Sequence, residues 1–323
     1  MTEIANQNSE IKNSPTTRLA PSPTGALHLG NARTFLVNWA MARQRRWRIV
    51  MRIDDLDGPR VKSGADAQAL DDLAWLGLDW DGAPTRQRDD LAPYHAALDA
   101  LAAAGRTFRC TCTRSDLRRA QSAPHQNDHE LRYPGTCRSR GMQEAPGEET
   151  SVRVIVPGSP VVFEDEFQGS QSVPVQDEVG DFVVATKARL PAYQLAVVVD
   201  DARQHVTHIV RGDDLIRSTG RQIALMRMLG VASLPQYWHL PLVYGPDGRR
   251  LAKRHGDTRV ATYRDLGVPP DAIVGLMASW SGVLKERAAL GAATFLDRFD
   301  IGRLPHEPIT FTAEDHRWLL EQI

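Results

Sequence analysis

Residues 16–55 read TTRLAPSPTGALHLGNARTFLVNWAMARQRRWRIVMRIDD. The apolar segment that opens this stretch is followed by a loop at 21–30, where two prolines and two glycines prevent regular structure. Apolar residues at helical spacing then predict a helix with Asn31 as its N-cap. The segment 48–55 is a second strand that ends in acidic residues. Strand, helix and strand predict a βαβ unit with a parallel sheet, whose carboxyl edge is the usual place for a ligand.

The same alternation continues along the chain. Helices are expected at 64–80 and 90–105. We expect buried strands at 192–201, 208–212 and 238–245, and a helix at 218–230.

Between these parts, 110–150 lacks periodicity, and the β-branched runs of 152–184 predict antiparallel strands that extend an inserted module. These patterns predict an α/β protein, a doubly wound Rossmann-type parallel sheet with an inserted α+β module and a short helical appendage. We expect a polar tail at 1–16, a first Rossmann half at 17–109 and an inserted module at 110–189. A second Rossmann half is expected at 190–256 and a helical appendage at 257–323.

Charge and composition narrow the class of protein. The chain has 39 basic and 40 acidic side chains, so contact with a nucleic acid would need a local patch and not a global positive field. No apolar run is long enough to span a bilayer, and residues 1–16 lack the apolar core of a secretion signal. We therefore expect a cytoplasmic protein that does not contact a membrane. Nothing in the sequence demands a dimer, so a monomer is expected.

Two segments carry residues suited to phosphate chemistry. The loop Pro21–Asn31 enters a helix N-terminus, whose free N–H groups favour phosphate, and His28 could reach a phosphate oxygen. The segment GRRLAKRHGD at 248–257 is a basic loop that could close over a triphosphate through Lys253. Taken singly, the first segment is better explained as a plain helix entry and the second as a solvated basic turn.

Together and in this order, the two segments resemble the HIGH and KMSKS signatures of class I aminoacyl-tRNA synthetases. RLAPSPTGALHLGNART, RIDDLD, LAWLGLDWD, AYQLAVVVDD, HIVRGDDLIRST and HLPLVYGPDGRRLAKRHG resemble the glutamyl branch of that family, over about residues 17 to 260. The chain ends about seventy residues after its KMSKS-like loop, which leaves no room for the anticodon-binding domain of that branch.

This length, together with the cysteine pattern and the phrase YQLAVVVDDA, is similar to a truncated paralogue within the branch. The resemblance implies activation of L-glutamate with ATP, without tRNA, to glutamyl-adenylate. Glutamate then passes to the cyclopentenediol of queuosine in the anticodon of tRNA(Asp). Two alternatives remain open: a minimal synthetase that charges a tRNA 3′ end, and a non-catalytic paralogue that binds tRNA or glutamate.

The resemblance also implies roles for individual residues. Catalysis is assigned to His28 and Lys253, with Mg²⁺ bound to ATP. Glutamate would be bound by Arg18, Ser22, Asp54, Tyr193 and Arg211. ATP would be bound by Pro21, His28, Gly30, Asn31, Leu240 and Lys253. Without the resemblance, salt bridges would account for the arginines and Asp54, and core packing for Tyr193.

Three departures from the family pattern are visible. Asp54 stands where the family has Glu, one methylene longer, so a longer or water-mediated contact to the substrate ammonium is expected. The HIGH-like motif ends in Asn31. The KMSKS-like loop has Arg250 for its first Lys and Ala252 for its Ser, which puts only a hydroxyl contact in doubt.

A metal site is expected near the three cysteines. Cys110 and Cys112 can share one ion and Cys137 can return to it by a loop, but Zn²⁺ takes four ligands. The resemblance implies Tyr133 as the fourth, whereas chemical preference alone favours His125 or His129. The zinc would be structural. The alternative is three reduced cysteines without a metal.

Overall fold

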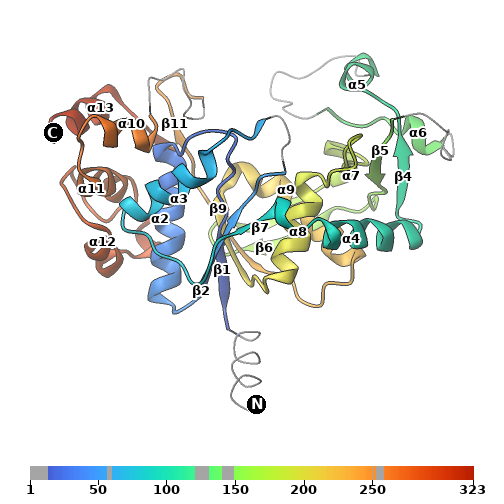
Figure 1. Ribbon diagram of the computed structural model, residues 1–323, viewed down its shortest axis with the longest axis horizontal. Helices are drawn as coiled ribbons and strands as arrows, with labels where there is room; N and C mark the ends of the chain where they lie inside the picture. Colours follow the sequence, from blue (N-terminus) through green and yellow to red (C-terminus); the bar gives the residue numbers. More distant parts are fainter. Residues whose placement is uncertain (1–13, 57–59, 121–130, 140–148, 250, 252–257) are drawn as a thin grey trace, which may run out of the picture.

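The computed structural model describes residues 14–56, 60–120, 131–139, 149–249, 251 and 258–323. A central sheet lies between two groups of helices, with the inserted part on the right and the last helices on the left (Figure 1). The strands are β1 (Thr16–Leu19), β2 (Arg48–Ile53), β3 (Thr85–Arg86), β4 (Thr107–Cys110), β5 (Ser151–Val154), β6 (Val161–Asp165), β7 (Gly169–Val173), β8 (Val183–Ala185), β9 (His208–Gly212), β10 (Gln236–Leu240), β11 (Val243–Tyr244) and β12 (Ile309–Thr310).

The helices follow the same order along the chain. They are α2 (Leu29–Gln44), α3 (Ala65–Trp75), α4 (Ala92–Ala103), α5 (Arg114–Ala120), α6 (Thr136–Ser139), α7 (Val175–Glu178), α8 (Tyr193–Arg203), α9 (Ile216–Met228), α10 (Val260–Asp265), α11 (Pro270–Trp280), α12 (Ala292–Arg298) and α13 (Ala313–Leu320), with short 3₁₀ turns η2 (Gln87–Asp89), η3 (Asp213–Leu215) and η4 (Ile301–Arg303).

Paired strands of the central sheet run parallel, except that β7 is antiparallel to β6, and the order of the strands reverses between β1 and β9. On one side β1 pairs with β2 and β2 with β3; on the other β9 pairs with β10 and β10 with β6. The two groups meet where β1 and β9 begin, because the amide of Thr207 donates to the carbonyl oxygen of Thr16 at 2.8 Å. This doubly wound parallel arrangement confirms the prediction for residues 16–55 and places a topological switch point between β1 and β9.

Alternation along the strands produces a core on each face of the sheet. On β9, Val210 belongs to the core around α2 and the C-terminal helices, while Ile209 belongs to the core around α8 and α9. On β10, Trp238 belongs to the core around α2 and Tyr237 to the core around α8 and α9. Because successive strand residues point to opposite faces, both faces are covered by helices and the strands are almost wholly buried.

The inserted part has its own antiparallel sheet, in which β5 lies between β4 and β8. The expectation that all strands of 152–184 extend this module is wrong for β6 and β7. The end of β6 pairs in parallel with β10, and β7 forms a hairpin on β6, so both belong to the central sheet. Apolar alternation reveals that these segments are strands, but not which partner they pair with.

Residues 192–201 were predicted as a buried strand, and the structure corrects this, because helix α8 starts at Tyr193. The residues from Gln194 to Asp201 are all buried, so the helix has no exposed face that would give the sequence a helical period. The prediction of Asn31 as an N-cap is also wrong. Helix α2 begins at Leu29 with His28 as its N-cap, which puts Asn31 in the first turn.

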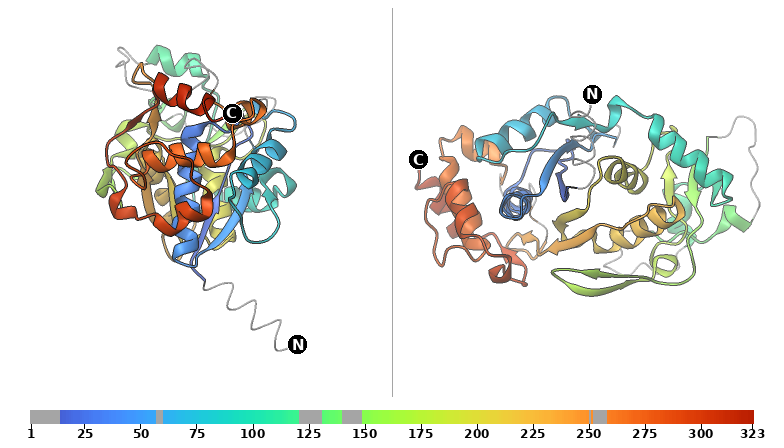
Figure 2. Two further views of the ribbon diagram at one scale, coloured as in Figure 1. Left: turned by 90° about the vertical axis from the view of Figure 1, so that its left-hand side faces the viewer. Right: turned by 90° about the horizontal axis from the view of Figure 1, so that it is seen from below.

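The C-terminal helices form one end of an elongated molecule, opposite the inserted part (Figure 2). Strand β12 pairs with β11, at Val243 and Ile309, which joins these helices to the strand that leads into the basic loop. The segment 257–323, which was expected to be helical, contains α11 and α13. Among the described helices, none is long and apolar enough to cross a membrane.

Candidate active site

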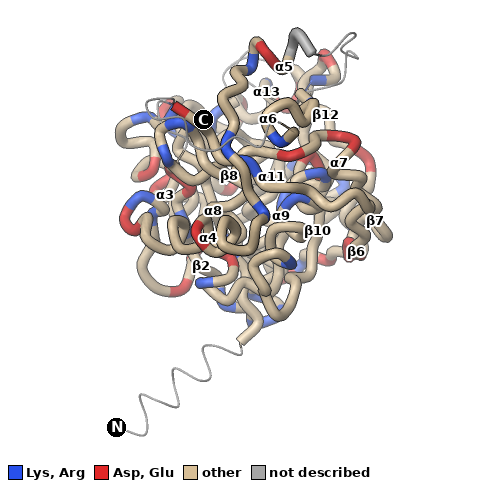
Figure 3. Tube along the Cα trace, turned by 90° about the vertical axis from the view of Figure 1, so that its right-hand side faces the viewer, with Lys and Arg blue, Asp and Glu red and all other residues tan. Residues whose placement is uncertain are grey.

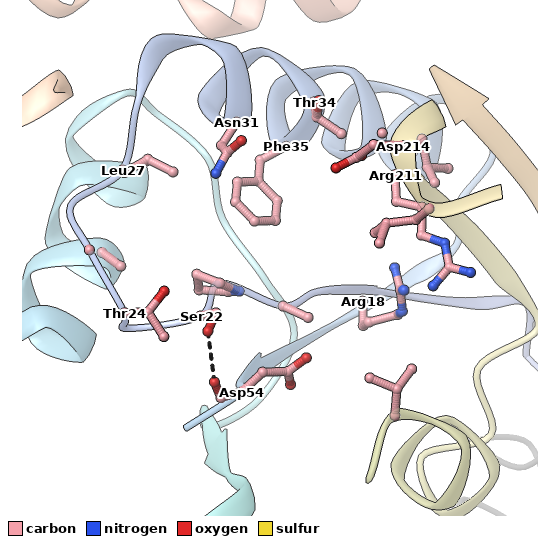
Figure 4. Close-up of a pocket in the computed structure, with 18 of the residues that line it drawn as sticks. Arg18, Ser22, Thr24, Leu27, Asn31, Thr34, Phe35, Asp54, Arg211 and Asp214 are labelled. Atoms are coloured by element: carbon pink, nitrogen blue, oxygen red, sulfur yellow. Dashed lines mark hydrogen bonds between the residues drawn. The ribbon is translucent and has the colours of Figure 1, made fainter. Parts of the chain in front are cut away.

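A cavity of about 320 Å³ opens at the carboxyl edge of the sheet, at the switch point between β1 and β9. Its walls come from β1 and the loop after it, the first turns of α2, the start of α8 and the segment that follows β9 (Figure 4). Of the residues predicted to bind substrates, those that line it are Arg18, Pro21, Ser22, Asn31, Asp54, Tyr193 and Arg211. The structure thus brings together residues that are up to 193 positions apart in the sequence.

Two guanidinium groups lie next to each other at one end of the cavity, Arg18 from β1 and Arg211 from β9 (Figure 4). Arg18 is 6% exposed and Arg211 5%. Arg211 donates to Thr219, Gln222 and His239, and its Nη1 has no hydrogen-bond partner among the described residues. A buried guanidinium nitrogen without a partner at a cavity wall is suited to bind a carboxylate.

Beneath these groups Arg52 compensates the charge of several carboxylates. It donates to Asp54 and to Asp201, each at 2.7 Å, and the Nε of Arg18 lies 3.4 Å from Asp201. Burial raises the pKa of Asp54 although Arg52 opposes this, whereas for Asp201 the effect of burial is outweighed by Arg52 and Arg18, which lower its pKa. The Arg52 contact means that Asp54 offers only part of its carboxylate to a substrate ammonium.

Ser22 and Tyr193 complete the same wall. The hydroxyl of Ser22 donates to the carbonyl oxygen of Asp54 at 3.1 Å, which joins the loop after β1 to the end of β2. Tyr193 is the first residue of α8 and is 46% exposed, which is unusual for an aromatic side chain in this fold. It faces the open cavity, where its ring and hydroxyl are accessible to a ligand.

The N-terminus of α2 is joined to the chain that follows the basic loop. Nδ1 of His28 lies 3.1 Å from Oγ1 of Thr258, the amide of Leu29 donates to the carbonyl oxygen of Thr258, and the amide of Val260 donates to that of Leu27. His28 and Gly30 lie beside the cavity and not in its lining. A Cβ on Gly30 would meet Val243 at 3.2 Å, so a glycine here lets α2 approach β11 closely.

On the far side of the basic loop Thr258 thus contacts the start of α2, and on the near side the amide of Leu251 donates to the carbonyl oxygen of Val243 on β11. Lys253 itself, together with Arg250 and Ala252, falls outside the described residues. Leu240 is completely buried at the end of β10 and does not line the cavity; Leu242, two residues later, does.

The sequence did not identify several residues of the cavity wall. Phe35 and Thr34 follow Asn31 at helical spacing and face the cavity from α2 (Figure 4). Asp214 projects from η3, just after Arg211. The i, i+3, i+4 relation to Asn31 could have revealed the first two, since these positions share a helix face. For Asp214 the sequence offered a weaker indication, the two acidic residues that closely follow Arg211.

The three cysteines form a compact cluster in the inserted part. Their sulfur atoms lie within 4.8 Å of one another, with Cys112 and Cys137 3.5 Å apart. The hydroxyl of Tyr133 accepts a hydrogen bond from the amide of Cys137 at 2.7 Å and interacts with the thiols of Cys110 and Cys137. Three sulfurs and one phenol oxygen thus converge, a donor set that is compatible with a tetrahedral metal ion.

A cation lies next to this cluster. The Nε of Arg153 donates to the sulfur of Cys110 at 3.2 Å, and its guanidinium stacks 4.0 Å from the centre of the Tyr133 ring. Burial raises the pKa of Cys112 to about 12, and for Cys137 the effect of burial is outweighed by hydrogen bonds, mainly from Thr111, which lower its pKa to about 7. His125 and His129 lie outside the described residues.

Comparisons with known proteins identify the family that this chain resembles. A family model described as tRNA synthetases class I (E and Q), catalytic domain, matches residues 15–316. Two curated relatives, from Rhodopirellula baltica and Symbiobacterium thermophilum, are named glutamyl-Q tRNA(Asp) synthetase. They are 46% and 44% identical to this chain, covering 90% and 92% of it and 94% and 96% of their own lengths.

More distant matches are longer proteins. A glutamate–tRNA ligase of Nitrosospira multiformis is 36% identical, with 95% of this chain aligned to 66% of that protein. A crystal structure of a glutamate tRNA ligase from Elizabethkingia meningosepticum superposes with a TM-score of 0.79 over 95% of this chain and 69% of its own, at 24% identity. That structure supports the fold, and the relatives of similar length cover about nine tenths of this chain.

Proposed function

The chain belongs to the class I tRNA synthetases for glutamate and glutamine, and we propose that it activates L-glutamate with ATP and transfers it to queuosine in the anticodon of tRNA(Asp). The relatives that match nearly the whole chain are named for that activity. One structural observation carries the proposal: Arg18 and Arg211, on adjacent strands, present buried cations at one end of a cavity whose opposite wall is the start of α2.

In the first step the side-chain carboxylate of glutamate binds Arg18 and Arg211. A guanidinium pair favours an anion over the neutral amide of glutamine, so the site selects the acid. The substrate ammonium faces Asp54 and Tyr193. The α-carboxylate then points toward Asn31 and the first turn of α2, where backbone N–H groups and the helix dipole favour phosphate.

The chemistry of this step requires no protein nucleophile. An oxygen of the glutamate α-carboxylate attacks the α-phosphorus of ATP, and the bond to the β-phosphate oxygen breaks to release pyrophosphate. Charge on the leaving pyrophosphate is neutralised by the start of α2, by His28, which contacts Thr258, and by Lys253, the role that the family motif gives this lysine. Mg²⁺ enters with ATP and supplies further positive charge.

In the second step a hydroxyl oxygen of the queuosine cyclopentenediol attacks the carbonyl carbon of glutamyl-adenylate, and AMP leaves. Basic and acidic residues are interspersed on the face that carries α4, α7 and β8, with no single basic field (Figure 3). Contacts with tRNA phosphates would therefore be local and confined to the cavity mouth. Since ATP and tRNA are cytoplasmic substrates, we assign the reaction to the cytoplasm.

The cysteine cluster would hold one structural Zn²⁺ through Cys110, Cys112, Cys137 and Tyr133. The converging donors and the adjacent Arg153, whose cation offsets negative charge on the ligands, support this assignment. When bound, the ion would link the chain around β4, through Cys110 and Cys112, to the segment that carries α6, through Cys137. The adenylate chemistry does not use it.

Exchange of labelled pyrophosphate into ATP tests the first step. We expect exchange that depends on glutamate, is absent with glutamine and needs no tRNA. Transfer of labelled glutamate is then compared on matched tRNA(Asp) samples with queuosine or guanosine at the wobble position, and on tRNA(Glu). Transfer only to the queuosine form supports the proposal; charging of tRNA(Glu) would support a minimal synthetase; absence of exchange would support a binding paralogue.

A further inference from the structure

A buried histidine and aspartate lie behind Arg211, outside the substrate cavity. Nδ1 of His239 is 2.6 Å from Oδ2 of Asp165, and both side chains are completely buried. On the other side of the imidazole, Nε2 lies 3.1 Å from the Nε of Arg211 and 2.9 Å from the hydroxyl of Thr219. Asp165 lies on β6, His239 on β10 and Arg211 on β9, so the central sheet itself brings these three residues together.

The proton positions follow from the partners. Oδ1 of Asp165 accepts hydrogen bonds from the amides of Phe167 at 3.0 Å and Gln168 at 2.7 Å, as an ionised carboxylate does. Burial raises the pKa of Asp165, but hydrogen bonds, first of all from His239, lower it below its usual value. His239 therefore donates Nδ1–H to Asp165. Arg211 can only donate, so Nε2 must carry the lone pair that accepts its Nε–H.

The remaining nitrogens of Arg211 are held by a second chain of hydrogen bonds. Nη2 donates to Thr219 and to Gln222, each at 2.7 Å, and the amide of Gln222 in turn donates to Gln194. These contacts orient the guanidinium plane and leave Nη1 as the nitrogen without a partner among the described residues. No described carboxylate forms an ion pair with Arg211, so its charge is available to the ligand in the cavity.

We propose that Asp165 and His239 are positioning residues, which fix the imidazole tautomer and thereby hold Arg211 in the orientation that binds the glutamate side-chain carboxylate. This rests on the proposed function, because it assigns Arg211 to glutamate. The effect is on glutamate affinity. ATP binds at the α2 side of the cavity, and neither Asp165 nor His239 touches that wall.

Asp165→Asn is the sharpest test, since it changes the proton arrangement with almost no change in shape. An amide group facing Nδ1 would donate to it, which moves the imidazole proton to Nε2 and sets Nε2–H against the Nε–H of Arg211. We expect the KM for glutamate in pyrophosphate exchange to rise about tenfold or more, because a hydrogen bond to a charged group is lost and a repulsive contact formed. The KM for ATP and kcat should stay within about threefold of wild type.

A second variant and a control separate positioning from a general loss of packing. His239→Phe removes the acceptor but keeps a ring, and should raise the glutamate KM similarly. Tyr237→Phe changes the neighbouring ring of the same strand, whose hydroxyl donates to the sulfur of Met226, and should leave both KM values unchanged. ¹⁵N NMR of labelled imidazole should report the Nδ1–H tautomer in the wild type and Nε2–H in Asp165→Asn.

Folded variants with the wild-type KM for glutamate, or an Asp165→Asn protein that keeps the proton on Nδ1, would overturn the proposal. An equal rise in the KM values for glutamate and ATP would also overturn it, because that indicates a general distortion of the site. Failure of the proposed function has a different signature, since the wild-type protein itself would then lack exchange that depends on glutamate.

Discussion

Nδ1 of His28 lies 3.1 Å from Oγ1 of Thr258, although 230 residues separate them in the sequence. Thr258 is buried, and its carbonyl oxygen accepts a hydrogen bond from the amide of Leu29. The HIGH-like segment and the chain that leaves the basic loop are thus held as one unit, at the position where ATP phosphates are proposed to bind.

This relationship predicts the effect of Thr258→Val. Loss of the hydroxyl removes this contact to the His28 ring, so the KM for ATP in pyrophosphate exchange should rise roughly three- to tenfold, as expected for one hydrogen bond. Thr258→Ser keeps the hydroxyl and serves as the control. An unchanged KM for ATP in the valine variant would show that the contact does not orient His28.

Lys253→Ala should reduce exchange that depends on glutamate at least about a hundredfold, because one cation near the developing pyrophosphate charge is removed. The melting temperature should not change. Lys285→Ala removes an exposed lysine from the C-terminal part and should behave like wild type. Equal exchange in the Lys253 variant would contradict the assigned role.

The buried imidazole makes stability depend on pH. Burial, reinforced by the nearby Arg211, lowers the pKa of His239 to about 4 in the folded protein, against about 6.5 in the unfolded chain. Between these values only the unfolded chain binds the proton, so the free energy of unfolding should fall as the pH drops from about 6.5 to 4, by up to about 1.4 kcal/mol per pH unit. Below pH 4 this contribution no longer changes.

Urea unfolding across that pH range, for the wild type and His239→Gln, measures this contribution. The slope should be smaller in the variant, while the carboxylates that do not contact His239 contribute equally to both proteins. Identical slopes would mean that the pKa of His239 is not lowered in the folded protein.

The metal proposal predicts that purified protein contains about one Zn²⁺ per chain. Cys112→Ser should lose it and lower the melting temperature, and Tyr133→Phe should bind zinc more weakly because the phenol oxygen is gone. Tyr263→Phe, whose hydroxyl contacts His316 far from the cysteines, is the matched control.

Pyrophosphate exchange should survive in the Cys112 variant, since the cluster is separate from the cavity. His125→Ala and His129→Ala test the competing fourth ligands. If Cys112→Ser retained one zinc per chain, the proposed site would be refuted. If either histidine variant lost zinc while Tyr133→Phe kept it, that histidine and not Tyr133 would be the fourth ligand.

Local sequence predicted the parts of the fold that depend on local patterns. The βαβ unit of 16–55 was predictable because strand, loop and helix differ there in period and in their prolines and glycines. Helix α8 was missed because burial on all sides removes the period. The pairing of β6 with β10 was missed because Tyr237 and Asp165 meet only through tertiary structure.

The site residues also fall into those that the sequence could identify and those that depend on tertiary structure. Motif residues such as Arg18, Asp54 and Arg211 could be placed by resemblance, and the structure gathers them at one cavity. Asp165 and His239 carry no motif, and their significance depends on hydrogen bonds between strands that are distant in sequence. Sequence reasoning has no signal for such a pair.

The most direct test of the account is to locate the ester formed with labelled glutamate. The acceptor is tRNA(Asp) that contains queuosine but lacks its 3′-terminal CCA, and the product is cut into anticodon and acceptor halves. The account predicts label in the anticodon half, and none when guanosine replaces queuosine. Loss of transfer on removal of the CCA end, with label in the acceptor half of the intact tRNA, would contradict it.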